Sequence, residues 1–539
     1  MQTEFDYIII GAGSAGCTLA NRLSAEGRFD IALIEAGGSN KSVFVKMPSA
    51  LSIPMHKKRF NWGFESVAEP YLDGRVIPTY RGKGLGGSSA INGMVFVRGH
   101  PKDFDEWEAM GAQGWNYQNC LPYFKKLENW QGGPSQHRGG LGPVKVTTGN
   151  NMALNPLYRA FIEAGVQAGY PRCEDYNGQS QEGFGQMQMN VDGGERASTA
   201  KAYLDPIRNR ANLTILKHTL THKVLIKDGR AKGVWVSPSG SGGAGYALKA
   251  RRDVILSAGS IGSPQILQHS GIGPKTVLEK AGIKPILIRE GVGENLSDHL
   301  EIFFQYKCLQ PVTLNAKLGL ISKALIGARW LVFKDGLGAT NHFESCGFIR
   351  SSPQRDWPDI QFHFLPGAVS YDGNTAFKGH GYQVHVGPNK PASRGHIRIR
   401  DAHISTPPQI QFNYLKEARD IEDWRATIRL TRMIMQGEAF GPYRGDEIQP
   451  GKDVVTDGQI DEWVRENAES AYHPSCSNRM GQEDDPLAVV NHQCQLIGLK
   501  GLRVVDSSIF PSIPNGNLNA PTMMLAERAA DIILGNIAT

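Results

Sequence analysis

Short apolar runs near the start of the chain flank a stretch with helical character. Residues 7–10 (YIII) and 31–34 (IALI) are apolar throughout, as expected for strands of a parallel sheet covered on both faces. Between them lies a segment rich in Ala and Leu, which favours a helix. The pattern therefore predicts a strand–helix–strand unit in the first 35 residues.

A later stretch alternates apolar and polar positions. Residues 212–236 (NLTILKHTLTHKVLIKDGRAKGVWV) predict a meander with a turn at Asp228 and Gly229. The Gly- and Ser-rich residues 238–245 predict a hairpin or surface loop within the same domain rather than a domain boundary.

The region from about 310 to 465 has its own character. Residues 359–366, 381–388 and 396–400 are strand-like, and residues 421–437 have helical periodicity. We therefore expect a second unit, a mixed sheet with helices on one face.

Residues 320–336 (LISKALIGARWLVFKDG) predict an apolar helix with Lys323, Arg329 and Lys334 dispersed along it. Such a helix can lie on a membrane surface. Burial in the second unit is the interpretation we favour, because the basic residues are few.

Composition, charge and cysteine usage narrow the class of protein. With 539 residues, 40% hydrophobic and 20% charged, the chain is globular and long enough for two domains or three lobes. A net charge of +6 without a long Lys/Arg run argues against nucleic acid as a partner. Seven cysteines without metal-ligand spacing predict reduced thiols, a cytoplasmic location and no metal site. We find neither a secretory signal nor an apolar stretch long enough to span a bilayer.

A glycine motif joins the first predicted strand to the helix. Gly11, Gly13 and Gly16 have the spacing GxGxxG, which permits a tight turn, close approach of a pyrophosphate and close helix–strand packing, respectively. The pyrophosphate would sit at the helix N-terminus. Glu35 ends the second strand, where a carboxylate can accept hydrogen bonds from ribose hydroxyls. The unit predicts a bound dinucleotide, FAD or NAD.

A second glycine-rich loop favours the flavin. Residues 81–99 (RGKGLGGSSAINGMVFVRG) combine closely spaced glycines with Ser88, Ser89 and Asn92. A flexible surface linker is the alternative, but this loop runs directly into an apolar segment, unlike a Gly/Ser linker. An NAD enzyme has no evident need for such a loop, whereas a long isoalloxazine ring does.

These residues carry a resemblance to a known family. Residues 81–99 resemble the first signature of the glucose–methanol–choline (GMC) oxidoreductases, FAD enzymes that oxidise alcohols. The second signature is matched by GSIGSPQILQHSGIG (259–273), and GVGENLSDH (291–299) resembles a further family segment. The similarity covers nearly the whole chain. Within the family, the segments most similar to choline-oxidising members are DHLEIFFQYKC, NHFESCGFIR, SRGHIRIR and YHPSCSNRMG.

The resemblance implies the fold class, α/β plus α+β, with a Rossmann-like FAD-binding domain and an inserted mixed-sheet substrate domain. The FAD-binding domain is expected to be discontinuous, comprising 1–155, 200–310 and 465–539. The substrate-binding domain is expected to comprise 156–199 and 311–464.

The resemblance also implies the FAD contacts. Some relatives attach FAD covalently through a histidine in the first glycine loop; Ile91 holds that position here, so we expect non-covalent FAD. The backbone at Val224 would meet the adenine ring. The residues expected to contact FAD are Gly11, Gly13, Ser14, Ala15, Gly16, Glu35, Ala36, Arg81, Gly82, Gly86, Gly87, Ser88, Asn92, Gly93, Met94, Val95, Val224, Ala258, Gly259, Asp506, Asn517, Pro521 and Thr522.

Two residues near the C-terminus are candidates for catalysis. Oxidising an alcohol removes the hydroxyl proton and delivers the Cα hydride to flavin N5. His473 suits the first task, because an imidazole with the usual pKa near 6.5 is only partly protonated at neutral pH. By resemblance to the family's His–His or His–Asn pair, Asn517 faces the same oxygen and orients it. Asn519, able to cap, and Pro521 then signal a helix whose N-terminus would point at the flavin pyrimidine ring.

Glu301 is the most informative residue for the substrate. The strand period places His299 and Glu301 on one face. By resemblance to choline-oxidising relatives, Glu301 lies near a trimethylammonium group, and Tyr472 and Phe343 belong to an aromatic cage around that cation. His363 keeps its matching position and is expected to help hold the substrate.

Two departures thin this cage. No tryptophan stands near residue 52, and Val369 stands where a phenylalanine is expected. A salt bridge at the domain interface is the alternative role for Glu301.

We therefore expect oxidation of a primary alcohol to an aldehyde, from choline to betaine aldehyde or on a related polar alcohol. The alternatives are the same chemistry on a non-cationic aliphatic, aromatic or polyether alcohol, a redox-silent flavin enzyme like the hydroxynitrile lyases, and a non-catalytic nucleotide-binding protein. The expected partners are the alcohol and an electron acceptor, a quinone-type carrier or oxygen, so oxidase activity stays open. Peripheral membrane contact is a further option.

Overall fold

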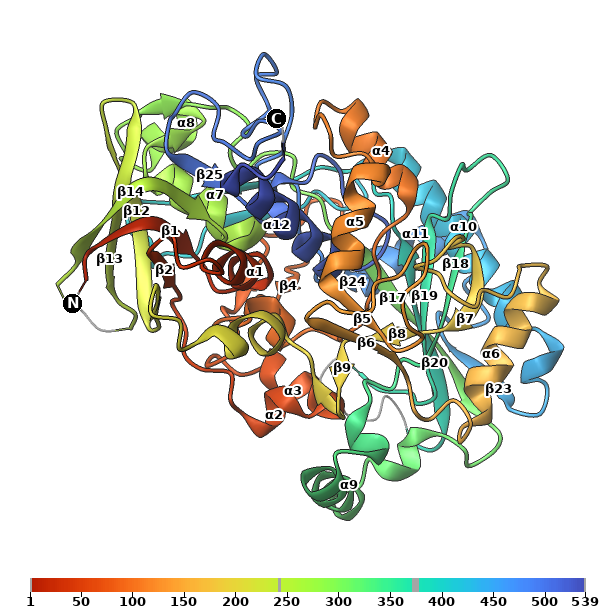
Figure 1. Ribbon diagram of the computed structural model, residues 1–539. Coiled ribbons are helices and arrows are strands. Elements are labelled where there is room, and N and C mark those ends of the chain that lie inside the picture. Colours follow the sequence, from red (N-terminus) through yellow and green to blue (C-terminus); the bar gives the residue numbers. More distant parts are fainter. Residues whose placement is uncertain (1, 241–243, 371–377, 538–539) are drawn as a thin grey trace.

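Two sheets organise the molecule, one on each side of a central region (Figure 1). The computed structural model describes residues 2–240, 244–370 and 378–537. The N-terminal strand and the C-terminal helix both belong to the half built around the first sheet.

The first sheet contains the strand–helix–strand unit that the sequence predicts. Helix α1 (Ser14–Leu23) connects two parallel strands, in which Ile9 lies opposite Leu33. Both side chains are fully buried, which explains why these runs show no polar alternation. In spatial order the strands are β11 (Leu213–Leu216), β2 (Ile31–Ile34), β1 (Glu4–Ile10), β14 (Tyr246–Leu256), β13 (Arg230–Pro238) and β12 (Thr219–Lys227), with β25 (Leu502–Val504) beside β14.

The predicted meander forms the antiparallel side of this sheet. Asp228 and Gly229 connect β12 to β13 with φ angles of 53° and 66°, the left-handed pair that a tight two-residue hairpin needs. β14 pairs with β13 along its first half and with β1 along its second half. The predicted loop 238–245 follows β13, and its middle lies outside the described residues.

The second sheet forms the roof of the central region. Its strands pair antiparallel, and the mixture of parallel and antiparallel pairings lies in the first sheet. In spatial order they are β23 (Arg444–Gln449), β17 (Leu300–Cys308), β20 (Gly381–Pro388), β19 (Ile360–Leu365), β18 (Ser345–Ile349) and β7 (Gly183–Gln186), with β24 (Glu469–Ser470) beside β17.

The strand assignments bear on the predicted domain boundaries. β17 and β24 fall inside ranges assigned to the FAD-binding domain, yet both pair within the second sheet. Apart from β7, the strands of the second sheet therefore come from the stretch between about residue 300 and residue 470. The division into two domains stays a prediction.

Helices pack against both sheets. α6 (Pro156–Gln167) and α10 (Ala418–Met435) contact each other and the second sheet, on the face opposite the central region. α1, α12 (Asn519–Leu534) and α5 (Tyr117–Leu127) form a connected group beside the first sheet. Other helices are α2 (Val43–Lys46), α3 (Ser52–Met55), α4 (Pro101–Ala109), α7 (Gly259–His269), α8 (Lys275–Lys280) and α11 (Asp457–Asn467). All seven cysteines are free and buried.

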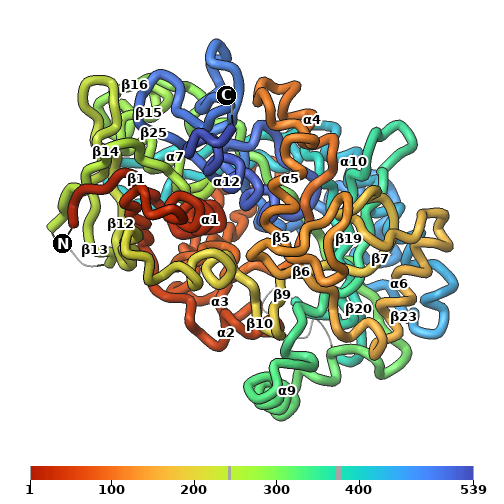
Figure 2. Tube along the Cα trace, viewed as in Figure 1, coloured from red at the N-terminus to blue at the C-terminus, as the bar shows by residue number. Residues whose placement is uncertain are grey.

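The helix predicted over 320–336 forms as α9 (Leu320–Phe333), but its predicted burial is wrong. Trp330 is its one buried residue. The helix packs along one side against the short turn at Gly336–Ala339, and because its apolar residues occur all round, most of them face outward. In the tube view α9 projects from the lower edge of the molecule (Figure 2).

Candidate active site

A cavity of about 980 Å³ between the two sheets collects most of the predicted site residues. Its walls come from both glycine loops, the start of α7, the inner face of the second sheet and the loops before α12. The predicted residues on its wall are Gly11, Gly13, Ser14, Ala15, Glu35, Ala36, Arg81, Gly82, Gly87, Ser88, Asn92, Gly93, Met94, Val95, Ala258, Gly259, Glu301, Phe343, His363, Tyr472, His473, Asp506, Asn517 and Thr522.

Four predicted FAD contacts do not line this cavity: Gly16, Gly86, Val224 and Pro521. A Cβ on Gly16 would lie 1.8 Å from the Gly11 carbonyl oxygen, so Gly16 serves helix–strand packing. The Val224 N–H donates to the Ser270 hydroxyl at 2.8 Å, which leaves only its carbonyl for an adenine ring. Gly86 donates its N–H to the Ala12 carbonyl at 2.7 Å, so it joins the two loops.

The first glycine loop has the open backbone that a pyrophosphate needs. Gly13 caps α1 without a side-chain hydrogen bond, and a Cβ there would meet nothing within 4 Å. Gly11 has φ +99°, and a Cβ there would lie 2.5 Å from the Ser257 carbonyl oxygen. The free N–H groups at the start of α1 therefore face the cavity and suit an anion.

Glu35 is held by the backbone of both loops. Its Oε2 accepts from the Ala12 N–H at 3.0 Å, and its Oε1 accepts from Gly37 and Gly84 at 2.8 and 2.9 Å. A carboxylate has about four acceptor positions, so one remains for a ribose hydroxyl. The residue thus supports the loops as well as facing the cavity.

The two glycine loops touch at a point where Gly87 cannot carry a side chain. A Cβ on Gly87 (φ +50°) would lie 2.7 Å from the Gly13 Cα. The second loop is also held by Arg196, which the sequence analysis does not single out and which donates to the Asn92 carbonyl at 2.6 Å and side chain at 2.9 Å. Arg196 lies 104 residues from Asn92 along the chain, so no local pattern marks it.

His473 and Asn517 meet as the sequence predicts. The Asn517 Nδ2 lies 3.1 Å from His473 Nε2. Asn517 Oδ1 accepts from Gln361 Nε2 at 3.2 Å, which fixes the amide so that its NH₂ group faces His473. His473 Nε2 must therefore carry the lone pair.

A second histidine fixes the other ring nitrogen. His299 Nε2 lies 2.9 Å from the Asn389 carbonyl oxygen, to which it can only donate. A neutral His299 then has its lone pair at Nδ1, 3.1 Å from His473 Nδ1. These partners assign the proton of His473 to Nδ1 and direct its free Nε2 toward Asn517.

Burial keeps this histidine group neutral. It lowers the pKa of His473 well below 6.5, and neighbouring His299, His363 and Arg81 lower it further. Burial likewise lowers the pKa of His299 to about 3 and that of His363 to about 4. At neutral pH the unprotonated fraction of His473 is therefore larger than that of an imidazole with the usual pKa near 6.5.

Asp298 positions the loop that carries the base. It accepts from the His473 backbone N–H at 2.7 Å and from the Ser470 and Tyr414 hydroxyls at 2.6 Å. Tyr472 has φ 62°, a costly conformation for an aromatic residue that these bonds help to hold.

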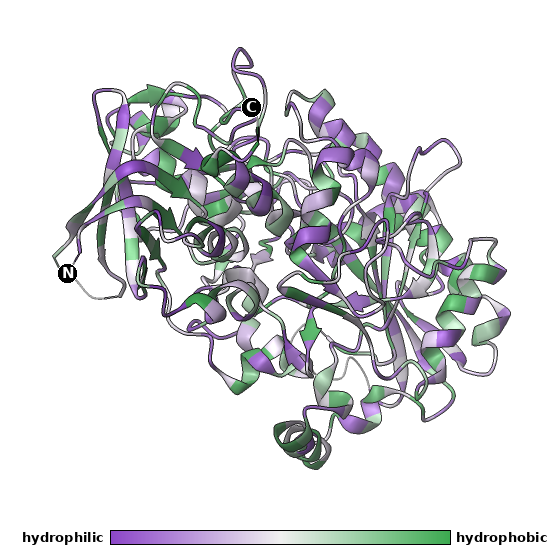
Figure 3. Ribbon diagram, viewed as in Figure 1, coloured by the Kyte–Doolittle hydropathy of each residue, from purple (hydrophilic) through white to green (hydrophobic). Residues whose placement is uncertain are grey.

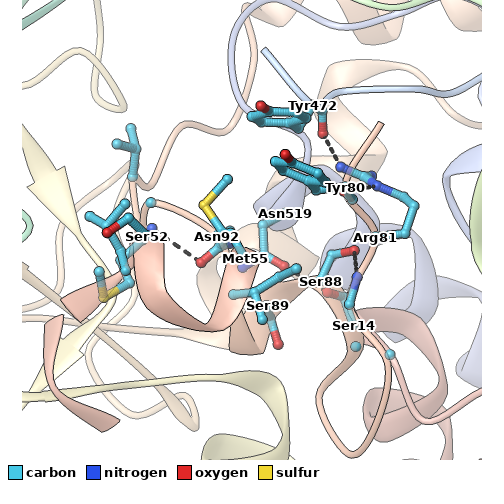
Figure 4. Close-up of a pocket in the computed structure, with 18 of the residues that line it drawn as sticks. Ser14, Ser52, Met55, Tyr80, Arg81, Ser88, Ser89, Asn92, Tyr472 and Asn519 are labelled. Carbon is cyan, nitrogen blue, oxygen red and sulfur yellow. Dashed lines mark hydrogen bonds between the residues drawn. The ribbon is translucent and has the colours of Figure 1, made fainter. Parts of the chain in front are cut away.

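An aromatic stack stands beside this loop. Tyr472 and Tyr80 are stacked with centroids 5.2 Å apart, and Figure 4 shows Arg81 next to both rings. Arg81 donates to the carbonyls of Tyr80 and Tyr472. Tyr80 was not predicted, although it directly precedes the second glycine loop.

The candidate cation site lies on the inner face of the second sheet. Glu301 Oε1 lies 3.2 Å from Nδ1 of His385, on the neighbouring strand β20. Phe303 and Phe343 pack on that histidine, with centroids at 4.0 and 5.0 Å. Both residues belong to the second sheet, in which β17 and β20 are neighbours.

The predicted cap of the last helix is wrong in one detail. α12 begins at Asn519 itself after Leu518, without a side-chain cap. Asn519 Oδ1 instead accepts from the Ser14 hydroxyl at 2.7 Å, because both residues line the same end of the cavity.

Comparisons with known proteins agree with this geometry. Family models described as GMC oxidoreductase match residues 5–301 and 391–526. The oxygen-dependent choline dehydrogenase of Photobacterium profundum is 60% identical over 536 residues, 99% of this chain and 94% of that protein. That of Brucella ovis is 51% identical over 532 residues, 99% of this chain and 96% of that protein.

Solved structures share the whole fold. Pyridoxine 4-oxidase from Mesorbium loti superposes with a TM-score of 0.89 at 29% identity, covering 99% of this chain and all of that one. An FAD-dependent oxidoreductase from Chaetomium thermophilum has a TM-score of 0.89 at 26% identity, covering 99% of both chains. The matched motifs, the cavity and the full-length relatives lead to one conclusion: this chain belongs to the GMC oxidoreductase family, and its cofactor is FAD.

Proposed function

We propose that this chain oxidises choline to betaine aldehyde with non-covalently held FAD. One observation carries the proposal. The catalytic pair, His473 and Asn517, lines the same cavity as Glu301 and three aromatic side chains, those of Phe303, Phe343 and Tyr472. The names of the relatives support the same substrate.

The chemistry of the alcohol follows from the assigned tautomer. The substrate hydroxyl would donate to His473 Nε2 and accept from Asn517 Nδ2, replacing the bond between them. His473 takes the hydroxyl proton, and the positive charge that forms is stabilised through its Nδ1–H by His299 Nδ1. FAD, when bound, would supply the acceptor for the hydride that leaves the substrate Cα.

Glu301 and the rings around it hold the trimethylammonium group. A quaternary ammonium has no N–H to donate, so charge attraction and cation–π contact are the forces available to it. His385 orients Glu301. The side-chain oxygen of Gln383 accepts from the Val369 N–H, so the NH₂ group of Gln383 is the one that lies 2.8 Å from His385 Nε2. His385 therefore has its proton on Nδ1, facing the Glu301 carboxylate.

The two-domain division, the non-covalent state of FAD and the contacts of FAD are part of this proposal. Ile91 is buried in the second glycine loop and offers no atom for a covalent bond to the ring. The electron acceptor is oxygen or a quinone-type carrier. The protein is cytoplasmic and contacts the membrane surface.

Anaerobic mixing of the FAD-loaded protein with choline tests the proposal, with flavin absorbance as the readout. The sharpest comparison is 3,3-dimethyl-1-butanol, in which a neutral carbon replaces the cationic nitrogen. We expect choline to bleach the flavin much faster. Equal rates, or bleaching only by benzyl alcohol or 1-hexanol, would favour a non-cationic alcohol. No bleaching by any of them would favour the lyase.

A further inference from the structure

Helix α9 presents an apolar surface to solvent. Most of its aliphatic and aromatic side chains have no protein covering them, and Figure 3 shows the helix in green at the lower edge of the molecule. The exposed fractions are 87% for Leu320, 79% for Ile321, 66% for Leu325, 55% for Leu331, 71% for Val332 and 69% for Phe333. Exposed apolar side chains are common singly, but six on one helix mark a contact surface.

Helices α2 and α3 extend this surface. Val43, Phe44 and Ile53 are 47%, 41% and 37% exposed. Their segment is joined to the α9 segment where the short helix Pro48–Ala50 packs on the turn Gly336–Ala339. We call these three residues and the six on α9 the apolar rim.

The apolar rim borders the cavity that holds the candidate active site. Four rim residues also line that cavity, Val43, Phe44 and Ile53 on one side and Leu331 on the other, and Lys323 lies on the cavity wall beside them. Whatever covers the rim therefore lies beside the entrance to the flavin.

The rim is basic. Residues 36–64 contain Lys41, Lys46, Lys57, Lys58 and Arg59, and residues 311–334 contain Lys317, Lys323, Arg329 and Lys334, with no Asp or Glu in either segment. Acidic neighbours are few: Glu195 pairs with Lys46 and Lys334, and Asp335 pairs with Arg329. In the described part of the chain, Lys317 and Lys323 have no ion pair.

We propose that the apolar rim docks on a membrane surface that contains anionic phospholipid. Exposed Leu, Ile, Val and Phe side chains enter the acyl boundary, while the flanking Lys and Arg contact the headgroups. Among the described residues no helix combines the length and apolar character that crossing a bilayer requires, so the contact is peripheral. A second copy of the chain suits the rim less well, because a symmetric pair would bring two basic surfaces together.

Docking through the apolar rim would place the entrance of the cavity next to the bilayer. A quinone dissolved in the lipid could then reach the active site, take up the two electrons removed from the alcohol together with two protons, and leave as a quinol. This purpose rests on the proposed function, whereas lipid binding itself does not.

Vesicle sedimentation of the FAD-loaded protein tests the docking. The variants are Ile321→Ser/Leu325→Ser/Val332→Ser, whose residues lie outside the cavity wall, and the matched control Leu141→Ser/Leu154→Ser, at exposed leucines elsewhere. We expect binding to phosphatidylcholine vesicles containing phosphatidylglycerol, weaker binding to phosphatidylcholine alone, and loss of binding at high salt. The triple variant should bind at least ~10-fold more weakly, and the control like the unaltered protein.

Activity measurements separate this inference from the proposed function. Choline oxidation with a water-soluble dye should be equal in all three proteins, whereas reduction of a vesicle-dissolved quinone should fall in the triple variant alone. Equal vesicle binding by the triple variant and the control would overturn the docking. So would a concentration-dependent dimer that the triple variant dissolves, since a second copy would then cover the rim. Failure of choline oxidation with the dye would count against the proposed function only.

Discussion

His299 and His473 meet through their Nδ1 atoms at 3.1 Å, with ring planes inclined at 86°. His299 does not line the cavity, yet its bond to the Asn389 carbonyl determines which nitrogen of His473 is free. The position of the free lone pair, on His473 Nε2, is thus determined by His299, which lies outside the cavity wall.

Removing His299 should therefore weaken catalysis without removing the base. We expect His299→Ala to lower kcat/KM for choline about 10- to 100-fold, because His473 loses the acceptor that fixes its tautomer and stabilises its charge. His299→Asn, whose side-chain oxygen can accept, should recover part of the loss. Both should keep their FAD. A pH profile of kcat/KM that is unchanged in His299→Ala would refute the positioning role.

Replacing the base itself should have a larger effect. His473→Gln should slow anaerobic flavin reduction by about 10²- to 10⁴-fold while the Kd for choline changes little, because Gln cannot take the hydroxyl proton. His269→Gln, at a buried histidine outside the cavity, is the matched control. Similar losses in the two variants would show that folding rather than chemistry was disturbed.

The cation site predicts a change in specificity. Glu301→Gln keeps the shape of the side chain and removes its charge, so KM for choline should rise about 10- to 100-fold. KM for 3,3-dimethyl-1-butanol should stay within a few-fold of the unaltered protein. If both substrates suffer equally, Glu301 supports the sheet rather than the cation.

The pH dependence has a definite sign. Neutral His473 is the active form, and burial lowers its pKa well below 6.5, so the neutral form persists at pH values where a free imidazole would be protonated. The kcat/KM for choline should therefore stay level as the pH falls through 6.5 and decline only in more acidic solution. Stopped-flow reduction rates at fixed ionic strength measure this. A midpoint at or above pH 6.5 would contradict the assigned environment.

The state of the flavin can be read directly. Acid precipitation should leave the yellow colour in the supernatant, and mass spectrometry should give the polypeptide of 59.0 kDa without an added flavin. Ile91 offers no nucleophile to the ring. A polypeptide heavier by one flavin would mean that another side chain forms the bond.

Local patterns predicted much of this molecule. The buried strands around Ile9 and Leu33 and the turn at Asp228–Gly229 are confirmed by the structure, and His473 and Asn517 lie in contact, while their catalytic roles stay predictions. Each depends on a short motif or on a family resemblance that spans the chain. The FAD and substrate roles of the residues stay predictions.

Features that depend on tertiary contacts could not be predicted from the sequence. His385 faces Glu301 only because β17 and β20 are neighbours, and Arg196 reaches Asn92 across more than a hundred residues. The exposure of α9 was misjudged, because an apolar helix has the same composition whether protein or lipid covers it. Burial is decided by what packs on a helix, and no local pattern carries that information.

The hydrogen bond between Ser14 and Asn519 joins residues 505 positions apart, at the two ends of the chain. A ribosome adding 5–20 residues per second needs roughly 25 to 100 s to pass from one to the other. During that time the nucleotide-binding loop is already synthesised, but the wall that α12 contributes does not yet exist. The complete cavity for FAD therefore forms only after α12 has been synthesised.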